Sequence, residues 1–126
     1  MTNEQIFFYL ALGIIAFIYL RRSVLSRGLQ HYTAAEITQR MNTGSILLDV
    51  RTAGERRAQS ISGSIHIPLH ELGSRMNDLE KYRSKEIICY CASGNRSVNA
   101  AIKLKKAGFQ AANLKGGIAS WNFSRR

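Results

Sequence analysis

A chain of 126 residues has room for one globular domain and a short appendage. Its 18 lysines and arginines against 8 acidic residues give a formal net charge of +10. The basic residues are spread along the whole chain without an RNA- or DNA-binding motif, which argues against nucleic acid as a partner. Two cysteines and three scattered histidines argue against a disulfide scaffold or a zinc site, and we expect neither a metal nor a cofactor.

The chain begins with an apolar segment. Residues 6–20 carry no charge, and two arginines, Arg21 and Arg22, follow directly. The segment is apolar on all helical faces and lies outside the α/β pattern that follows, so a core helix of a soluble domain is the weaker alternative. A secretory signal is disfavoured because the basic residues come after the apolar stretch. We predict a membrane-anchoring helix and juxtamembrane segment over residues 1–27, and one domain over residues 28–126.

The charges beside this segment predict its orientation. Arg21, Arg22 and Arg27 lie on its C-terminal side, and basic residues beside a membrane span favour the cytoplasmic face. The domain is then expected on the inner face of the membrane, where reducing conditions keep cysteines as thiols. Attraction to anionic lipid head groups accounts for the excess of positive charge more simply than nucleic acid does. We therefore expect a single-pass membrane protein with membrane lipid as one partner and a cytoplasmic domain.

Behind the anchor, strands alternate with helices. A capping box from Thr33 to Glu36 predicts a helix to about Met41, and Gly44 ends it. The later elements are expected as strands over 45–50, 65–67, 86–90 and 111–114, and as helices over 69–79, from the 91–97 loop to Ala107, and over 117–122. This alternation predicts an α/β fold with a mostly parallel central sheet flanked by helices and preceded by one transmembrane helix.

The most informative segment is the loop from Cys91 to Ser97. Cys91 follows a β-branched and aromatic run typical of a buried strand, so it stands at a strand's carboxyl end, where ligands bind in parallel α/β sheets. The amphipathic helix after the loop points its free N–H groups and the positive end of its dipole back at the cysteine, which favours a thiolate. Gly94 permits the tight turn. We predict that Cys91 is a nucleophile in an anion-binding loop. The residues of this loop are Ala92, Ser93, Gly94, Asn95, Arg96 and Ser97.

The other cysteine and the histidines have simpler interpretations. Cys89 lies inside the apolar run, so we expect a packed thiol rather than a disulfide partner for Cys91. No two histidines share a helix at metal-ligand spacing, so each is expected at the surface or beside a strand. The histidines are His31, His66 and His70.

Several blocks of the sequence occur in the order found in single-domain rhodaneses. The segment Cys91–Ser97 matches their C-x-x-G-x-R-S signature. The other blocks are Leu47-Leu48-Asp49-Val50-Arg51-Thr52 with Glu55, then Gly63-Ser64-Ile65-His66-Ile67-Pro68-Leu69, Ala107-Gly108-Phe109, and Leu114-Lys115-Gly116-Gly117-Ile118-Ala119-Ser120-Trp121. Ordered blocks are more specific than one motif. Over about residues 30–123 the chain therefore resembles the rhodanese family.

The resemblance implies a sulfurtransferase. Cys91 would take a sulfane sulfur from a small anion such as thiosulfate, become a persulfide, and pass the outer sulfur to a thiol or cyanide. It further implies that Asp49 and Arg51 lie at the edge of the site as supporting residues. The residues themselves favour a local pairing of Asp49 and a surface position of Arg51 over a catalytic role. Arg96 is the better functional cation, although its guanidinium can also brace Asp49 or Glu55.

The sequence departs from the family pattern in places. Residues 59–63 and Arg57 differ from the usual connecting segment, which concerns packing more than chemistry. Ala92 stands where many relatives have Arg or Lys, which favours a persulfide over thiosulfate as the physiological donor. Two alternatives remain. One is a non-enzymatic, membrane-anchored binding module, since fold does not fix function. The other is a Cys-dependent phosphatase or arsenate reductase, whose loop has one residue more between Cys and Arg and suits a tetrahedral phosphate better.

Overall fold

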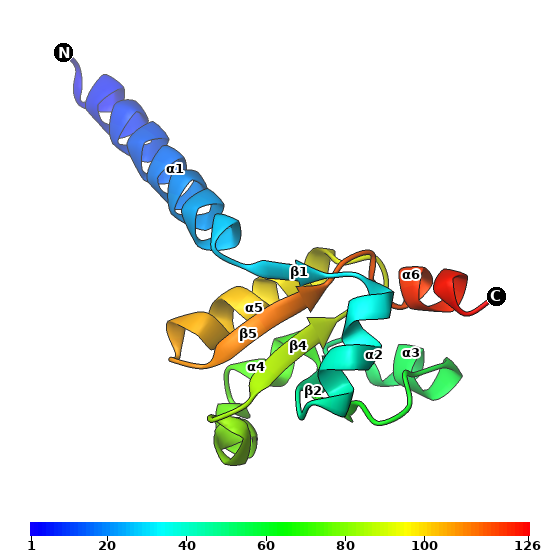
Figure 1. The fold of residues 1–126 in the computed structure, drawn as a ribbon. Coiled ribbons are helices and arrows are strands. Elements are labelled where there is room, and N and C mark those ends of the chain that lie inside the picture. The colour runs from blue at the N-terminus through cyan, green and yellow to red at the C-terminus, as the bar shows by residue number, and fades with distance from the viewer.

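The computed structural model describes the backbone of residues 1–126 and all side chains except those of residues 25–27. Its helices and strands follow one another along the chain as shown in Figure 1. In chain order they are α1 (Asn3–Arg27), β1 (Gln30–Tyr32), α2 (Ala34–Asn42), β2 (Ile46–Asp49), α3 (Ala53–Ala58), β3 (Ile65–His66), α4 (Leu69–Leu72), the 3-10 helix η1 (Met76–Tyr82), β4 (Glu86–Tyr90), α5 (Asn95–Lys106), β5 (Gln110–Leu114) and α6 (Gly117–Ser124).

The strands form one five-stranded sheet in the order β1-β5-β4-β2-β3, and every pairing is parallel. Strand β4 lies in the middle and its side chains alternate between two cores. Ile87 and Cys89 point to the face covered by α5, α4 and η1, whereas Ile88 and Tyr90 point to the face covered by α2 and α6. A parallel strand buried on both faces needs apolar residues at successive positions, which is the composition of this run. The predicted α/β fold is therefore confirmed.

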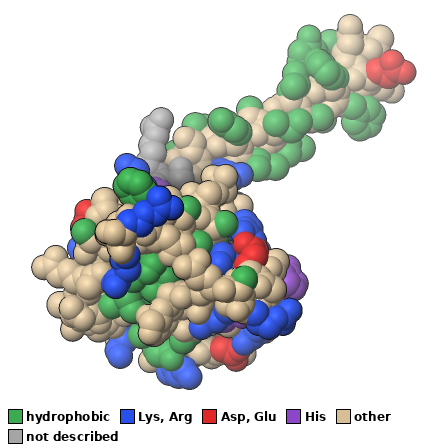
Figure 2. All heavy atoms as spheres, turned by 90° about the vertical axis from the view of Figure 1, so that its right-hand side faces the viewer, with side chains coloured by type: hydrophobic (Ala, Val, Ile, Leu, Met, Phe, Trp, Pro, Cys, Tyr) green, Lys and Arg blue, Asp and Glu red, His purple; other side chains and the backbone are tan. Residues whose placement is uncertain are grey.

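Helix α1 meets the domain with its C-terminal part, beside α5, and projects away from it (Figure 1). Its segment Asn3–Val24 is long and apolar enough to cross a membrane, and none of its most apolar window is buried. Figure 2 shows hydrophobic side chains exposed along the projecting helix. A core helix of a soluble domain buries such side chains, so α1 is not a core helix of this domain. The predicted N-terminal apolar helix is confirmed, while its orientation stays a prediction; the side chain of Arg27, used for that prediction, lies outside the described residues.

The predicted single helix over residues 69–79 is wrong. The chain forms α4, leaves the helix at Gly73, and resumes at Met76 as a 3-10 helix. At the break, the hydroxyl of Ser74 donates a 3.0 Å hydrogen bond to the carbonyl of Glu71, the kind of local bond that competes with helix continuation. Glycine and serine together therefore interrupt a pattern whose apolar spacing is helical.

Two short elements were not predicted. Strand β1 has three residues, of which only Tyr32 is buried, so no alternation of apolar and polar residues predicts it. Helix α3 has no buried residue, but it carries a capping box in which Thr52 and Glu55 satisfy each other's backbone N–H groups. That box is visible in the sequence and is the feature from which α3 could have been predicted.

Candidate active site

Cys91 lies at the turn between the central strand and the helix that follows. It comes directly after β4, and α5 begins four residues later at Asn95. Gly94 precedes the helix with φ +110, a left-handed conformation that favours glycine and lets the chain fold back over the cysteine. Cys91 is only 1% exposed. The sequence prediction of a cysteine at a strand's carboxyl end, before a helix, is confirmed.

The Cys91 sulfur sits among hydrogen-bond donors. Its Sγ accepts a 3.0 Å hydrogen bond from the backbone N–H of Gly94 and lies 3.3 Å from the hydroxyl of Ser97. Burial raises the pKa of the thiol, but hydrogen bonds from the Ser97 hydroxyl and from the backbone N–H groups of Ser97, Gly94 and Ser93 outweigh it. The pKa of Cys91 is therefore below its ordinary value. The loop thus stabilises the thiolate, which is the nucleophilic form of cysteine.

Cys89 differs from Cys91 although it lies two residues away on the same chain. It points into the core below α5 and is fully buried. Burial, with a smaller effect of the charge on Cys91, raises the pKa of Cys89 far above its ordinary value. Both cysteines are free thiols. The prediction that Cys89 is a packed thiol rather than a disulfide partner of Cys91 agrees with this burial and with its free sulfur.

The start of α6 holds the backbone of the cysteine loop. The N–H of Ile118 donates to the carbonyl of Cys91 at 2.9 Å, and that of Ala119 donates to the carbonyl of Ala92 at 3.3 Å. Gly117, with φ +61, makes this approach possible, because a Cβ there would collide with the Cys91 carbonyl and lie 2.6 Å from that of Ala92. Gly117 belongs to one of the sequence blocks shared with the rhodanese family, but its contact with Cys91 was not predicted.

Asp49 and Arg51 form a buried ion pair beside the site. Asp49 has no exposed surface and accepts hydrogen bonds from Arg51 Nε at 3.0 Å and Nη2 at 2.8 Å, and from the hydroxyl of Tyr90 at 3.0 Å. Burial raises the pKa of Asp49, but the hydrogen bonds and charge of Arg51 together hold it below its ordinary value. Arg51 also donates to the carbonyl of Gln59 at 2.6 Å.

This geometry corrects one expectation. Arg51 is 4% exposed and is not a surface charge. Its guanidinium links the end of β2 to the segment after α3 and lies 5.4 Å from the ring centre of Tyr90. In the described contacts neither Asp49 nor Arg51 touches Cys91, and their supporting role stays a prediction.

Arg96 braces a neighbouring helix. Its two terminal nitrogens donate to the two carboxylate oxygens of Glu55 at 2.7 and 2.8 Å. Hydrogen bonds from Arg96 and then from Thr52 outweigh burial and lower the pKa of Glu55 to about 2. The sequence left open whether the Arg96 guanidinium braces Asp49 or Glu55, and in the structure it pairs with Glu55. The bidentate pair ties the first turn of α5 to the start of α3 and so restrains the loop between β4 and α5.

A polar chain behind the sulfur was missed in the sequence. The Ser97 hydroxyl has a second acceptor 2.6 Å away, the side-chain oxygen of Asn113, so its single proton is shared between this oxygen and the Cys91 sulfur; the amide nitrogen of Asn113 lies 3.1 Å from Nδ1 of His31. Ser97 and Asn113 are buried, whereas His31 is exposed, as predicted. A buried polar group needs a partner, so the single asparagine within the apolar strand β5 was the available indication.

Ser97→Ala is expected to raise the pKa of Cys91, because the thiolate loses a hydroxyl donor and keeps only backbone N–H groups. Asn113→Leu is the matched control. It removes the competing acceptor of the Ser97 hydroxyl, so the proton is free to point at sulfur and the pKa should fall. The measurement is the rate at which iodoacetamide modifies Cys91 as a function of pH. Identical profiles for wild type and Ser97→Ala would contradict the role given to this hydroxyl.

Comparison with known proteins agrees with this geometry. The rhodanese-like domain family matches residues 33–124. A sulfurtransferase of Allochromatium vinosum is 35% identical over 77 residues, which are 60% of this chain and 70% of that protein. The uncharacterized protein YibN of Escherichia coli is 30% identical over 116 residues, 90% of this chain and 80% of that protein. The crystal structure of a rhodanese-related protein from Thermoplasma volcanium has a TM-score of 0.70 and 35% identity, covering 75% of this chain and 92% of that one. With the cysteine loop, the parallel sheet and a family match over most of its length, the chain belongs to the rhodanese-like domain family.

Proposed function

We propose that the protein is a sulfurtransferase in which Cys91 carries the transferred sulfur as a persulfide. Membership in the family and the sulfurtransferases among its relatives support sulfur transfer in general. The observation that carries the proposal for this chain is the Cys91 sulfur itself, with a lowered pKa and hydrogen bonds from the loop that follows it. A thiolate held in this way is a nucleophile toward sulfur.

The reaction proceeds in two displacements. The Cys91 thiolate attacks the outer sulfur of thiosulfate, an S–S bond forms, and sulfite leaves with the electron pair of the old S–S bond. Cys91 then carries a persulfide whose outer sulfur is anionic, and the N–H groups of the loop are placed to stabilise such a charge. Cyanide or a thiolate attacks this outer sulfur, the new S–S bond breaks, and the Cys91 thiolate returns. The products are thiocyanate or a new persulfide.

The donor is proposed to be a persulfide or a small sulfur-containing anion. Ala92 brings no charge to the loop, so an anionic donor must be attracted by other groups. A hollow of about 340 Å³ lies at the start of α5, with Thr52 and Arg96 among its lining residues. The Arg96 guanidinium, although paired with Glu55, gives this hollow a cation. Thiosulfate serves as the test donor because both of its products are simple to measure.

The experiment is the mass of the full-length protein after incubation with thiosulfate and removal of the excess. The expected result is a gain of one sulfur atom on the peptide that contains Cys91, lost again on addition of cyanide with formation of an equal amount of thiocyanate. Assays of the same protein distinguish a sulfurtransferase from the two alternatives, a binding module and a phosphatase. A binding module would gain no sulfur from thiosulfate or from glutathione persulfide, and a phosphatase would hydrolyse an aryl phosphate instead. Either result would contradict the proposal.

We also propose that α1 anchors the protein in a membrane with the domain on the cytoplasmic side. The full-length chain is expected to stay in the membrane fraction during carbonate extraction, because exposed apolar side chains cover α1, and a chain lacking residues 1–27 is expected in the soluble fraction. A topology reporter fused after Arg126 should report cytoplasm, as the arginines after the span favour. Activity of the reporter only on the opposite side of the membrane would overturn the orientation.

A further inference from the structure

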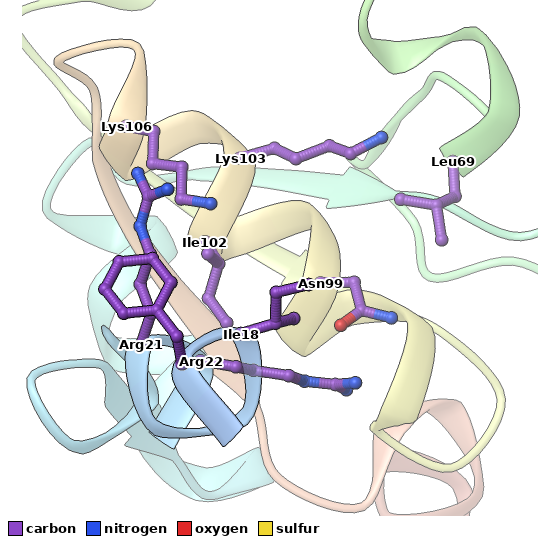
Figure 3. Close-up of a pocket in the computed structure, with 9 residues that line it drawn as sticks. Ile18, Arg21, Arg22, Leu69, Asn99, Ile102, Lys103 and Lys106 are labelled. Carbon is purple, nitrogen blue, oxygen red and sulfur yellow. The ribbon is translucent and has the colours of Figure 1, made fainter. Parts of the chain in front are cut away.

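A hollow of about 390 Å³ lies where α1 meets the domain, between the end of α1 and α5 (Figure 3). Its walls come from both helices and from the start of α4. The lining residues are Phe17, Ile18, Arg21, Arg22, Leu69, Asn99, Ile102, Lys103 and Lys106. The junction is tied by Lys105, whose ammonium donates a 2.8 Å hydrogen bond to the carbonyl of Gly28, just after α1. The hollow therefore belongs to a defined junction between anchor and domain.

The charges around this hollow have one sign. Two arginines of α1 and two lysines of α5 line it, and no Asp or Glu does. Among the side chains that the structure describes, none of these four makes an ion pair or hydrogen bond, in contrast to Arg40, Arg51, Arg56, Arg75, Arg83 and Arg96, which all pair with carboxylates. Cations gathered without counter-charges repel one another and attract an anion. The charge of this hollow therefore favours an anionic ligand.

The apolar and charged residues are arranged in order along α1. Phe17 and Ile18 precede Arg21 and Arg22 by four positions, so each apolar side chain lies one helical turn from a cation on the same face. The stretch able to cross a membrane runs to Val24, which puts the two arginines in its last turn, at the level of the lipid head groups.

Helix α5 presents one face to the same hollow. Asn99, Ile102, Lys103 and Lys106 are spaced by three and four residues, the spacing of a single helical face. In Figure 3 the side chains of Ile18 and Ile102 lie toward each other, with Lys103 and Lys106 on the helix above them. The apolar part of the hollow is therefore continuous with the apolar span, and the cationic part faces the domain.

We propose that this hollow binds one anionic phospholipid, with its phosphate between the arginines of α1 and the lysines of α5 and its acyl chains along Phe17 and Ile18. The proposal rests on the anchoring of α1 proposed above. A phospholipid has the same order of groups as the hollow, with acyl chains on the membrane side and an anionic phosphate next to them. A free phosphate would use only the cations, and the apolar half of the hollow would have no role.

The test is native mass spectrometry of the full-length protein in detergent micelles, titrated with phosphatidylglycerol, phosphatidylcholine or inorganic phosphate. We expect one phosphatidylglycerol per protein, bound more tightly than phosphatidylcholine and not displaced by inorganic phosphate. Replacing two of the four cations, with Lys103→Gln and Lys106→Gln together, is expected to weaken phosphatidylglycerol binding by roughly tenfold or more.

The matched control is Arg57→Gln with Lys85→Gln, which removes the same charge from two exposed side chains outside the hollow and should leave lipid binding unchanged. An equal loss in both double variants, equal affinity for the two lipids, or displacement by inorganic phosphate would overturn the site. Carbonate extraction of the same variants reports anchoring separately. Wild-type protein that stays anchored but does not select phosphatidylglycerol would refute only the lipid site, whereas extraction of the wild type would refute the anchor.

Discussion

Cys91→Ser is expected to abolish persulfide formation and to lower sulfur transfer from thiosulfate to cyanide by a factor on the order of a thousand or more. The same donors that hold the thiolate, the N–H of Gly94 and the hydroxyl of Ser97, remain in place in this variant. They cannot compensate, because a serine hydroxyl ionises far less readily than a thiol and is a poor nucleophile toward sulfur. The initial rate of thiocyanate formation measures the effect.

Cys89→Ser is the control for this experiment. Cys89 is fully buried, packs in the core below α5, and has a strongly raised pKa, so it supplies no thiolate. We expect the variant to keep most of its activity and to lose about 1–2 kcal/mol of stability, because a hydroxyl replaces a sulfur in an apolar site. Transfer retained in Cys91→Ser, or lost in a folded Cys89→Ser protein, would refute Cys91 as the sulfur carrier.

Gly117→Ala is expected to have the second largest effect. The new Cβ would collide with the carbonyl of Cys91 and lie 2.6 Å from that of Ala92, and the residue would have to keep φ +61. Both carbonyls belong to backbone, which cannot move without shifting the cysteine loop. We expect a loss of roughly 3 kcal/mol or more in the free energy of unfolding and a large loss of sulfur transfer. Denaturant unfolding and the thiocyanate assay measure the two effects.

Gly44→Ala separates the collision from backbone strain. Gly44 also has a left-handed backbone, with φ +102, but a Cβ there would meet no atom within 4 Å. This variant is expected to lose only about 1 kcal/mol of stability and no activity. If Gly117→Ala behaves like Gly44→Ala, the contact between α6 and the cysteine loop is not what holds the active loop in place.

The local elements of the site could be predicted from the sequence. The run Glu86–Tyr90 is apolar at successive positions, which is the requirement of a strand buried on both faces, and the spacing after Cys91 is that of an amphipathic helix. These patterns depend on residues only a few positions apart, so they can be recognised from the sequence alone. The same holds for the apolar segment at the N-terminus, which lacks charge over one continuous stretch.

Segments with weak local preferences could not be predicted as reliably. The apolar spacing over residues 69–79 indicated one helix, but the hydrogen bond from Ser74 to the Glu71 carbonyl and the glycine before it end α4 early. Strand β1 forms because it pairs with the edge of β5, where Tyr32 lies beside Leu114. Its three residues are mostly exposed, so their sequence does not indicate this pairing. In both cases the deciding contacts lie outside the periodic pattern.

What the sequence determined by itself is the proposed nucleophile, its place after a central strand, and the family to which the cysteine loop points. The tertiary structure alone decided which groups tune that nucleophile. Gly117 meets Cys91, Asn113 meets Ser97, and Arg96 meets Glu55 across long separations in sequence. Arg51 illustrates the physical reason. A charged side chain is costly to bury unless its partners are arranged around it, and those partners are brought together only when the sheet and its connections have formed.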